Sequence, residues 1–225
     1  LDDPKVREGL IGAMTDYTRP YLEGCTPPSS TSWKDPDNNV AFHNRTTIMT
    51  HNATISIAAK WLDDMNNETL KPEQRAIAKK NYYELIRTAG FPNKPDGTKM
   101  QYRSAVKTGV IFKDSKNNAR AKEFVSFLLQ EENLTPYVAG SLGRWFPVTK
   151  VAQQSPFWKA DRHRLSVYNQ YMAGTVTFEF TKNYKFTIVN NENVWAKAMN
   201  RVVSEKIPVD QAVDEMIARI KAIAS

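Results

Sequence analysis

The feature that most constrains the fold is a stripe of apolar residues near the C-terminal end of the chain. The stripe consists of Val209, Val213, Met216, Ile220 and Ile223, at alternating steps of four and three residues. This spacing places all five side chains on one face of a long helix, which must bury that face against another element. A second amphipathic helix is expected after Pro4, because apolar residues recur there at similar steps.

Shorter patterns fill the rest of the chain. Helices are expected at 37–42, 55–62, 72–80, from 115 to 128, at 136–139 and from 193 onward. Three stretches rich in aromatic and β-branched residues predict strands at 46–51, 82–91 and 101–112. Helices and strands together predict an α/β fold.

Length, cysteine count and net charge limit the class of protein. A chain of 225 residues with 41% apolar residues can bury a full core, so it is expected to be globular. The single Cys25 cannot form an internal disulfide. A net charge of +7 allows a nucleic-acid or membrane-surface partner. However, the basic residues form no run of five, and a solvated basic surface accounts for them.

A resemblance to a known family begins with the residues Asp37 to Phe42, which carry an Asp-Asn-Asn-x-Ala-Phe run. The segment Arg45 to Asn52, Arg-Thr-Thr-Ile-Met-Thr-His-Asn, follows it. This order resembles the hinge-entry region of the extracellular solute-binding proteins of ABC transporters, family 1, which bind sugars. In that family a short strand after the helix delivers an Asn to a cleft between two lobes.

Further stretches are similar to the same family. They are residues 83–96, residues 104–129, the Gly140-x-x-Gly143-Arg144-Trp145-x-Pro147 loop, and residues 193–223. The chain departs from the family at Ala53-Thr54-Ile55, where many relatives show Gly-Pro-Trp, so Ile55 lacks the aromatic platform of those relatives. The chain also lacks the family's N-terminal portion and starts without Met at Leu1, so we expect a fragment or a processed chain.

The resemblance implies a periplasmic-binding-protein-like fold of two lobes. Residues 1–100 and 141–225 would form most of the C-terminal lobe, and residues 101–140 would belong to the other lobe. The implied function is that of a non-enzymatic receptor that binds a small solute, which we expect to be a sugar, and docks on the membrane permease of an ABC importer. The implied location is the periplasm, or the cell exterior with a lipid anchor. Self-association of the truncated chain is also expected, because the missing lobe would leave apolar surface uncovered.

Candidate ligand-binding residues follow from how proteins bind sugars, with aromatic faces for the C–H patches of the ring and planar polar groups for the hydroxyls. The candidates are His51, Asn52, Tyr102, Ser104, Arg144, Trp145, Asn190 and Asn191. Each also has a purely structural explanation. Trp145 could be a core aromatic beside a surface Arg, His51 and Asn52 could be a packed ring and a turn residue, and Asn190 and Asn191 could cap a helix. We expect Trp145 to be partly exposed and to face a cleft.

The sequence gives little support to a catalytic or metal-binding function. His43, His51 and His163 lack metal-ligand spacing, and no nucleophile elbow or phosphate-binding loop is present, so neither a metal nor a cofactor is expected. The run Asp161-Arg162-His163-Arg164 is typical of a charged surface. Two rival functions remain open, a carbohydrate-active enzyme with paired carboxylates and a basic nucleic-acid-binding domain.

Overall fold

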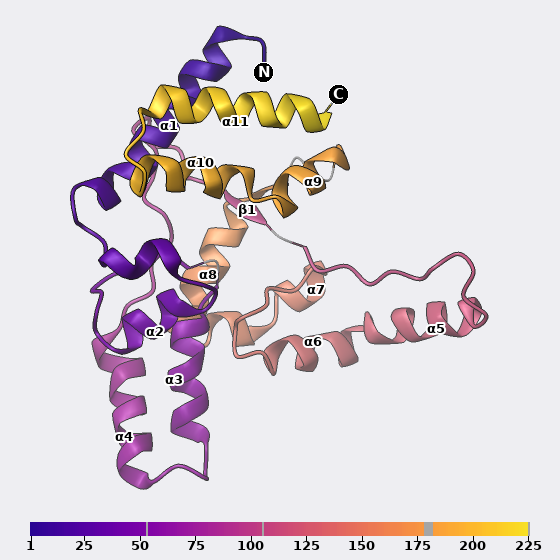
Figure 1. The fold of residues 1–225 in the computed structure, drawn as a ribbon. Coiled ribbons are helices and arrows are strands. Elements are labelled where there is room, and N and C mark those ends of the chain that lie inside the picture. The colour runs from indigo at the N-terminus through magenta and orange to yellow at the C-terminus, as the bar shows by residue number, and fades with distance from the viewer. Residues whose placement is uncertain (53, 105, 178–181, 225) are drawn as a thin grey trace. The chain divides into compact units, whose positions relative to one another are not determined.

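The computed structural model describes residues 1–52, 54–104, 106–177 and 182–224. These residues are mostly helical and contain one two-stranded sheet (Figure 1). The helices are α1 (Pro4–Leu22), α2 (Asp37–His43), α3 (Ser56–Asn66), α4 (Pro72–Lys80), α5 (Asn118–Leu128), α6 (Glu131–Ala139), α7 (Lys150–Gln153), α8 (Arg162–Met172), α9 (Lys185–Asn191), α10 (Val194–Val203) and α11 (Val209–Ala224). Strand β1 (Tyr102–Ser104) pairs in parallel with β2 (Thr175–Thr177).

The chain divides into two compact units. Residues 1–50 and the chain after residue 177 form one, which we call the terminal unit, and residues 51–177 form the other, the central unit. These boundaries differ from those of the expected lobes, 1–100 with 141–225 and 101–140. The assignment of residues to lobes therefore stays a prediction.

The terminal unit is built on the long C-terminal helix that the apolar stripe predicts. Val213 and Ile220 of α11 are 0% and 1% exposed, in a cluster with buried residues of α1, α9 and α10. Burying one such side chain contributes about 1.5–3 kcal/mol. The expected N-terminal helix is also confirmed as α1, with Pro4 in its first turn and the Asp3 carboxylate accepting a hydrogen bond from the Lys5 backbone N–H at 2.9 Å.

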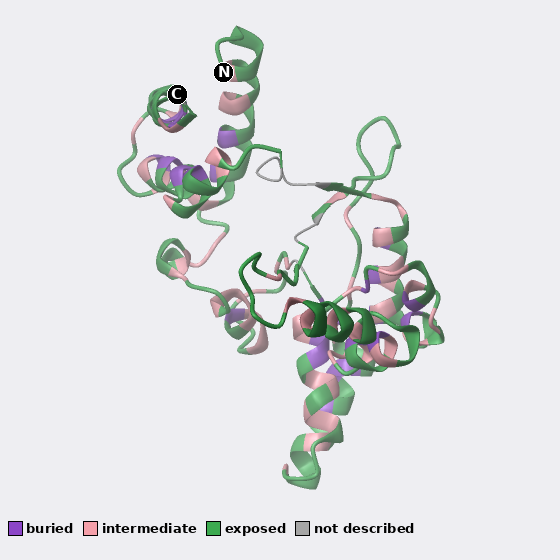
Figure 2. Cartoon of the chain, turned by 90° about the vertical axis from the view of Figure 1, so that its right-hand side faces the viewer, coloured by how far each residue is buried: buried purple, intermediate pink, exposed green. Residues whose placement is uncertain are grey.

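The central unit has two small cores. One gathers Ile55, Ala58, Tyr82 and Val167 between α3, α8 and the π-helical turn Asn81–Leu85 that extends α4. The other surrounds Trp158, which is 1% exposed, on the 3₁₀ turn Pro156–Lys159. Figure 2 shows the buried residues gathered where helices meet, while much of the remaining chain is exposed.

The predicted strand at 46–51 is wrong. The chain leaves α2 through Arg45, which has a φ of 60°, and continues without regular structure. Ile48 is 100% exposed and Met49 is 82% exposed. A β-rich composition favours a strand only where a neighbouring strand takes up its backbone groups, and no described strand pairs with these residues.

The strand predicted at 82–91 is also wrong, and the cause lies in α8. Helix α4 runs into the π-helical turn, and the chain is then extended but unpaired with any described strand. Side chains of α8 form hydrogen bonds with the backbone of this segment, where a neighbouring strand would otherwise form them. Arg162 Nη2 donates to the carbonyls of Tyr82 and Ile86 at 2.9 and 3.1 Å, and Gln170 Oε1 accepts from the Phe91 N–H at 2.9 Å.

Of the strand predicted at 101–112, the residues that the structure describes form only Tyr102–Ser104. Its partner β2 offers three residues, so the ladder cannot extend further within the described chain. Beyond it Val110 and Phe112 are 72% and 79% exposed. The described part of the molecule is thus helix-rich with a small parallel sheet, rather than evenly α/β.

Candidate functional site

Six rings of the central unit lie next to one another in a continuous series. We call it the aromatic row: His51, Phe91, Tyr102, Tyr171, Phe146 and Trp158. Neighbouring ring centroids are 4.4 to 5.6 Å apart, within the range of favourable aromatic contacts. The row begins at the exposed ring of His51 and ends at Trp158 in the core, so it joins surface and interior.

Gln170 holds the first part of this row in place. Its side chain is 7% exposed, and it links two extended segments to α8 by accepting from the Phe91 N–H at 2.9 Å and donating to the Met100 carbonyl at 2.7 Å. Gly90 lies against it, since a Cβ there would be 2.5 Å from Gln170 Oε1. Residue 90 must therefore be small for Phe91 to take its position.

Tyr102 occupies the middle of the row. Strand β1 carries it opposite Thr175, and its ring meets Phe91 and Tyr171 edge to face at 5.1 and 5.6 Å. Burial of the phenol raises the pKa of Tyr102, with a further contribution from Tyr171. The hydroxyl therefore stays protonated at neutral pH and can donate a hydrogen bond.

His51 and Asn52 lie at the exposed end of the row. The His51 ring is 5.0 Å from Phe91. Asn52 Nδ2 donates to the Ser56 hydroxyl at 3.0 Å, at the first residue of α3. The expected residue His51 thus lies next to Phe91, which the sequence did not single out.

The loop between α6 and α7 carries Arg144 and Trp145. The loop is folded tightly around Gly143, which has a φ of 92°, and the Trp145 N–H donates to the Ser141 hydroxyl at 3.1 Å. Trp145 is 50% exposed, so the expected partial exposure is confirmed. Whether it faces a ligand cleft stays a prediction.

Charged groups flank that loop. Arg144 Nη2 is paired with Asp63 of α3 at 3.1 Å. The ammonium of Lys107 lies 5.5 Å from the centroid of the Trp145 ring, in the range of a cation–π contact. Phe146, the next residue along, stacks on Tyr171 at 4.4 Å with an interplanar angle of 5°, which ties the loop to the aromatic row.

The remaining candidates belong to neither the aromatic row nor the loop of Arg144 and Trp145. Ser104 belongs to β1, and its side chain lies outside the described part of the chain. Asn190 and Asn191 are in the terminal unit, where they are the last two residues of α9. Both are exposed, and the N-cap of the following helix is Asn193 instead. The capping explanation for Asn190 and Asn191 is therefore wrong.

The run Asp161 to Arg164 is not the surface segment that its charges suggest. His163 is 1% exposed, with Nδ1 2.7 Å from the Thr88 hydroxyl and Nε2 2.9 Å from the Tyr82 carbonyl. Burial lowers the pKa of His163. Asp161 caps α8 through the backbone N–H groups of His163 and Arg164. The capping position of Asp161 was the signal that could have revealed this helix start.

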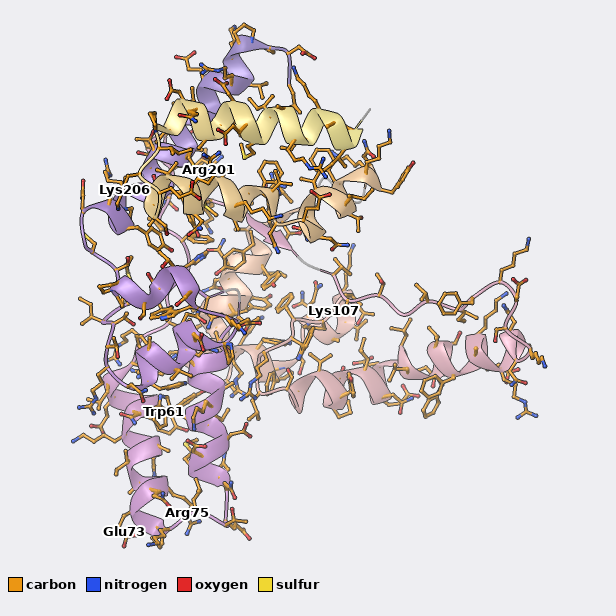
Figure 3. All side chains as sticks on the ribbon, viewed as in Figure 1. Trp61, Glu73, Arg75, Lys107, Arg201 and Lys206 are labelled. Atoms are coloured by element: carbon orange, nitrogen blue, oxygen red, sulfur yellow. The ribbon has the colours of Figure 1, made fainter. Side chains whose placement is uncertain are left out.

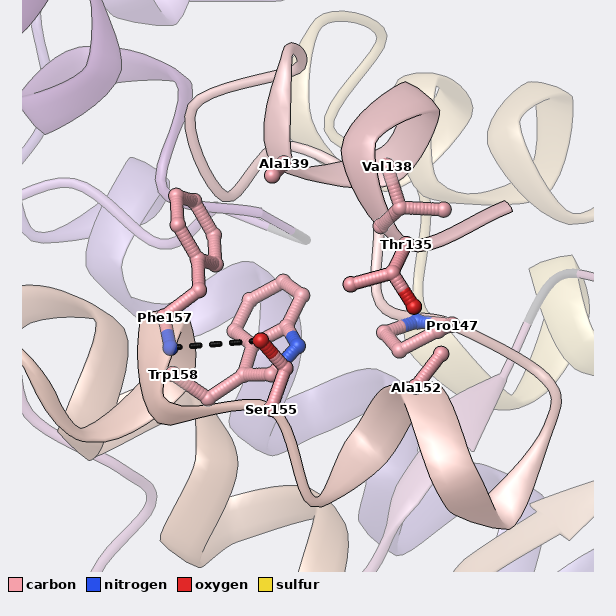
Figure 4. Close-up of a pocket in the computed structure, with 8 residues that line it drawn as sticks. All are labelled: Thr135, Val138, Ala139, Pro147, Ala152, Ser155, Phe157 and Trp158. Carbon is pink, nitrogen blue, oxygen red and sulfur yellow. Dashed lines mark hydrogen bonds between the residues drawn. The ribbon is translucent and has the colours of Figure 1, made fainter. Parts of the chain in front are cut away.

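Two hollows lie elsewhere in the described chain. The one around Trp158 leaves essentially no volume for a water molecule. Its lining includes Ser155, whose hydroxyl accepts a hydrogen bond from the Phe157 N–H at 3.3 Å (Figure 4). The other lies between α10 and α11 and has a volume of about 200 Å³. Four of the charged residues that line it form ion pairs with one another, Arg219 with Glu192 at 2.7 Å and Arg201 with Glu215. Neither contains an expected site residue.

Comparison with known families decides the class of the protein. A model of the bacterial extracellular solute-binding protein family matches residues 6–165, which is more than half of the chain. The chain belongs to this family. Comparisons with curated proteins and with solved structures give no significant match.

Membership makes this solute-binding protein an extracellular or periplasmic receptor for a small molecule, and such receptors typically deliver their ligand to a membrane transporter. The family is one of binding proteins rather than enzymes. The matched residues include His51, Asn52, Tyr102, Arg144 and Trp145 and end before Asn190. No helix among the described residues combines the length and apolar character that crossing a membrane requires. The same residues contain no group of three His, Cys, Asp or Glu that could hold a metal ion.

Proposed function

We propose that this solute-binding protein binds a carbohydrate in a cleft between two lobes and delivers it to the permease of an ABC importer. The observation that supports this most directly is the exposed Trp145 on a loop tied to the aromatic row. A ring that is half in water before the ligand arrives can stack on the apolar face of a sugar. The lobes would be residues 1–100 with 141–225, and residues 101–140.

Polar groups around these rings suit the hydroxyls of a sugar. The His51 ring and the Tyr102 hydroxyl belong to the aromatic row, Asn52 follows His51 in the chain, and Arg144 adjoins Trp145. Each can donate or accept in a fixed plane, which is how proteins distinguish hydroxyl orientations. We include Ser104, Asn190 and Asn191 as further proposed contacts. The receptor would work in the periplasm, or outside the cell on a lipid anchor.

Isothermal titration of the chain with a panel of mono- and oligosaccharides tests the proposal. We expect one saccharide to bind, and Trp145→Ala to weaken its binding by about fivefold, because a stacked aromatic contact contributes on the order of 1 kcal/mol beyond area burial. Trp195→Ala is the matched control, since Trp195 is a 36% exposed tryptophan of the terminal unit. Full affinity in Trp145→Ala would refute the role of the ring.

The same experiment separates a receptor from an enzyme. The bound saccharide is recovered after prolonged incubation and analysed by chromatography. A receptor returns it unchanged, whereas cleavage products from pure protein would show a carbohydrate-active enzyme.

A further inference from the structure

The net charge of the chain is concentrated in one stretch. Residues 87–122, which we call the basic segment, contain nine Lys and Arg against two Asp. This surplus of seven equals the net charge of the whole chain, so the other residues balance one another. The nine cations are all exposed: Arg87, Lys94, Lys99, Arg103, Lys107, Lys113, Lys116, Arg120 and Lys122.

The basic segment runs through the candidate site. It contributes Phe91 and Tyr102 to the aromatic row. It also brings Lys107 to the Trp145 ring, with Nζ 5.5 Å from the ring centroid. Figure 3 labels Lys107 on the extended stretch between β1 and α5. Because a surplus of positive charge raises the local concentration of anions, this region favours a negatively charged ligand over a neutral one.

Lys107 is better placed than Arg144 to bind such a charge. The guanidinium of Arg144 is already paired with Asp63 at 3.1 Å, whereas Lys107 forms no ion pair among the described residues. An ammonium above one side of an indole can contact a substituent of a sugar ring that stacks on the same indole. A carboxylate or phosphate would gain a charge-assisted hydrogen bond there.

We propose that the solute is an anionic saccharide, whose ring stacks on Trp145 and whose carboxylate or phosphate binds Lys107. This proposal rests on the proposed function, since it names the class of saccharide for the same site. It explains why the basic charge is gathered in the segment that carries Phe91 and Tyr102 and brings Lys107 to the Trp145 ring.

The test is titration of the full chain with paired probes, glucuronate and galacturonate against glucose and galactose, and glucose 6-phosphate against inorganic phosphate. We expect at least one acidic sugar to bind about tenfold more tightly than its neutral counterpart. Lys107→Gln should lower the affinity for the acidic sugar by about tenfold and so narrow its advantage over the neutral counterpart. Lys116→Gln removes the same charge from the basic segment away from Trp145 and should change affinity by less than about twofold.

The other outcomes overturn the proposal in distinguishable ways. If a neutral sugar binds as tightly as its acidic counterpart, the anionic class is wrong and the carbohydrate receptor stands. If no saccharide binds, both proposals fail. If inorganic phosphate binds as tightly as glucose 6-phosphate and Trp145→Ala has no effect, the segment binds anions without recognising a sugar. If a single-stranded oligonucleotide binds more tightly than every acidic sugar, the basic segment is a nucleic-acid surface.

Discussion

At the scale of single residues, buried polar side chains organise the central unit. His163 is an example, because it links α8 to the chain around the π-helical turn. Its Nε2–H donates to the Tyr82 carbonyl at 2.9 Å, so Nδ1 accepts from the Thr88 hydroxyl at 2.7 Å. Burial disfavours the protonated ring, in which the Thr88 hydroxyl would have to accept from Nδ1 instead. Arg162 and Arg87 add positive charge that also disfavours protonation, and Asp161 partly opposes them.

A pH dependence of stability follows. Because the pKa of His163 is lowered in the folded chain, the unfolded chain takes up the proton first as pH falls. The contribution of His163 to the free energy of unfolding is therefore complete above about pH 6.5, the ordinary pKa of the group, and declines below it.

Urea unfolding at about pH 7.5 and about pH 5.5 measures the decline. His163→Gln should reduce the difference between the two conditions, and His51→Gln, on an exposed ring, is the control. An unchanged difference in His163→Gln would show that other groups cause the decline.

At the scale of elements, the helices were predictable and the strands largely were not. The steps of three and four in α1 and α11, and the prolines at their starts, are local signals that the sequence displays directly. Whether 82–91 becomes a strand depends instead on Arg162 and Gln170, which come from a helix about 80 residues away. A β-rich composition cannot reveal that side chains will take the place of a neighbouring strand.

The loop between α6 and α7 offers a test at this scale. Gly143 has a φ of 92°, and a Cβ there would lie 2.5 Å from the Cδ1 atom of Ile55, which is 5% exposed. We expect Gly143→Ala to lower the free energy of unfolding by about 1–3 kcal/mol, through left-handed strain and overpacking. Gly109→Ala meets nothing within 4 Å and should change stability by less than about 0.5 kcal/mol. Equal effects in chemical denaturation would contradict this account of the loop.

At the scale of the whole molecule, the sequence could name candidate residues of the site, but it could not show which of their rings contact one another. His51, Tyr102 and Trp145 follow from chemistry and from family resemblance. Their neighbours Phe91 and Tyr171 come from other parts of the central unit, and only the fold brings those rings together. Asn190 and Asn191 belong to the terminal unit, and their contact with a ligand stays a prediction.

The distribution of apolar surface leads to the last prediction, that the chain associates with itself. Helix α5 has no buried residue, and its Phe124 and Phe127 are 63% and 55% exposed on one helix face. In the next helix Tyr137 is 71% exposed. Soluble monomers rarely expose large apolar patches, because covering them from water is favourable.

Sedimentation velocity over a range of concentrations should therefore detect species larger than a monomer. Combined Phe124→Ser and Phe127→Ser should shift the distribution towards monomer, whereas Ile77→Ser, at a 59% exposed position on α4, should not. A chain that stays monomeric at all concentrations would contradict the prediction that it associates through Phe124 and Phe127 of α5.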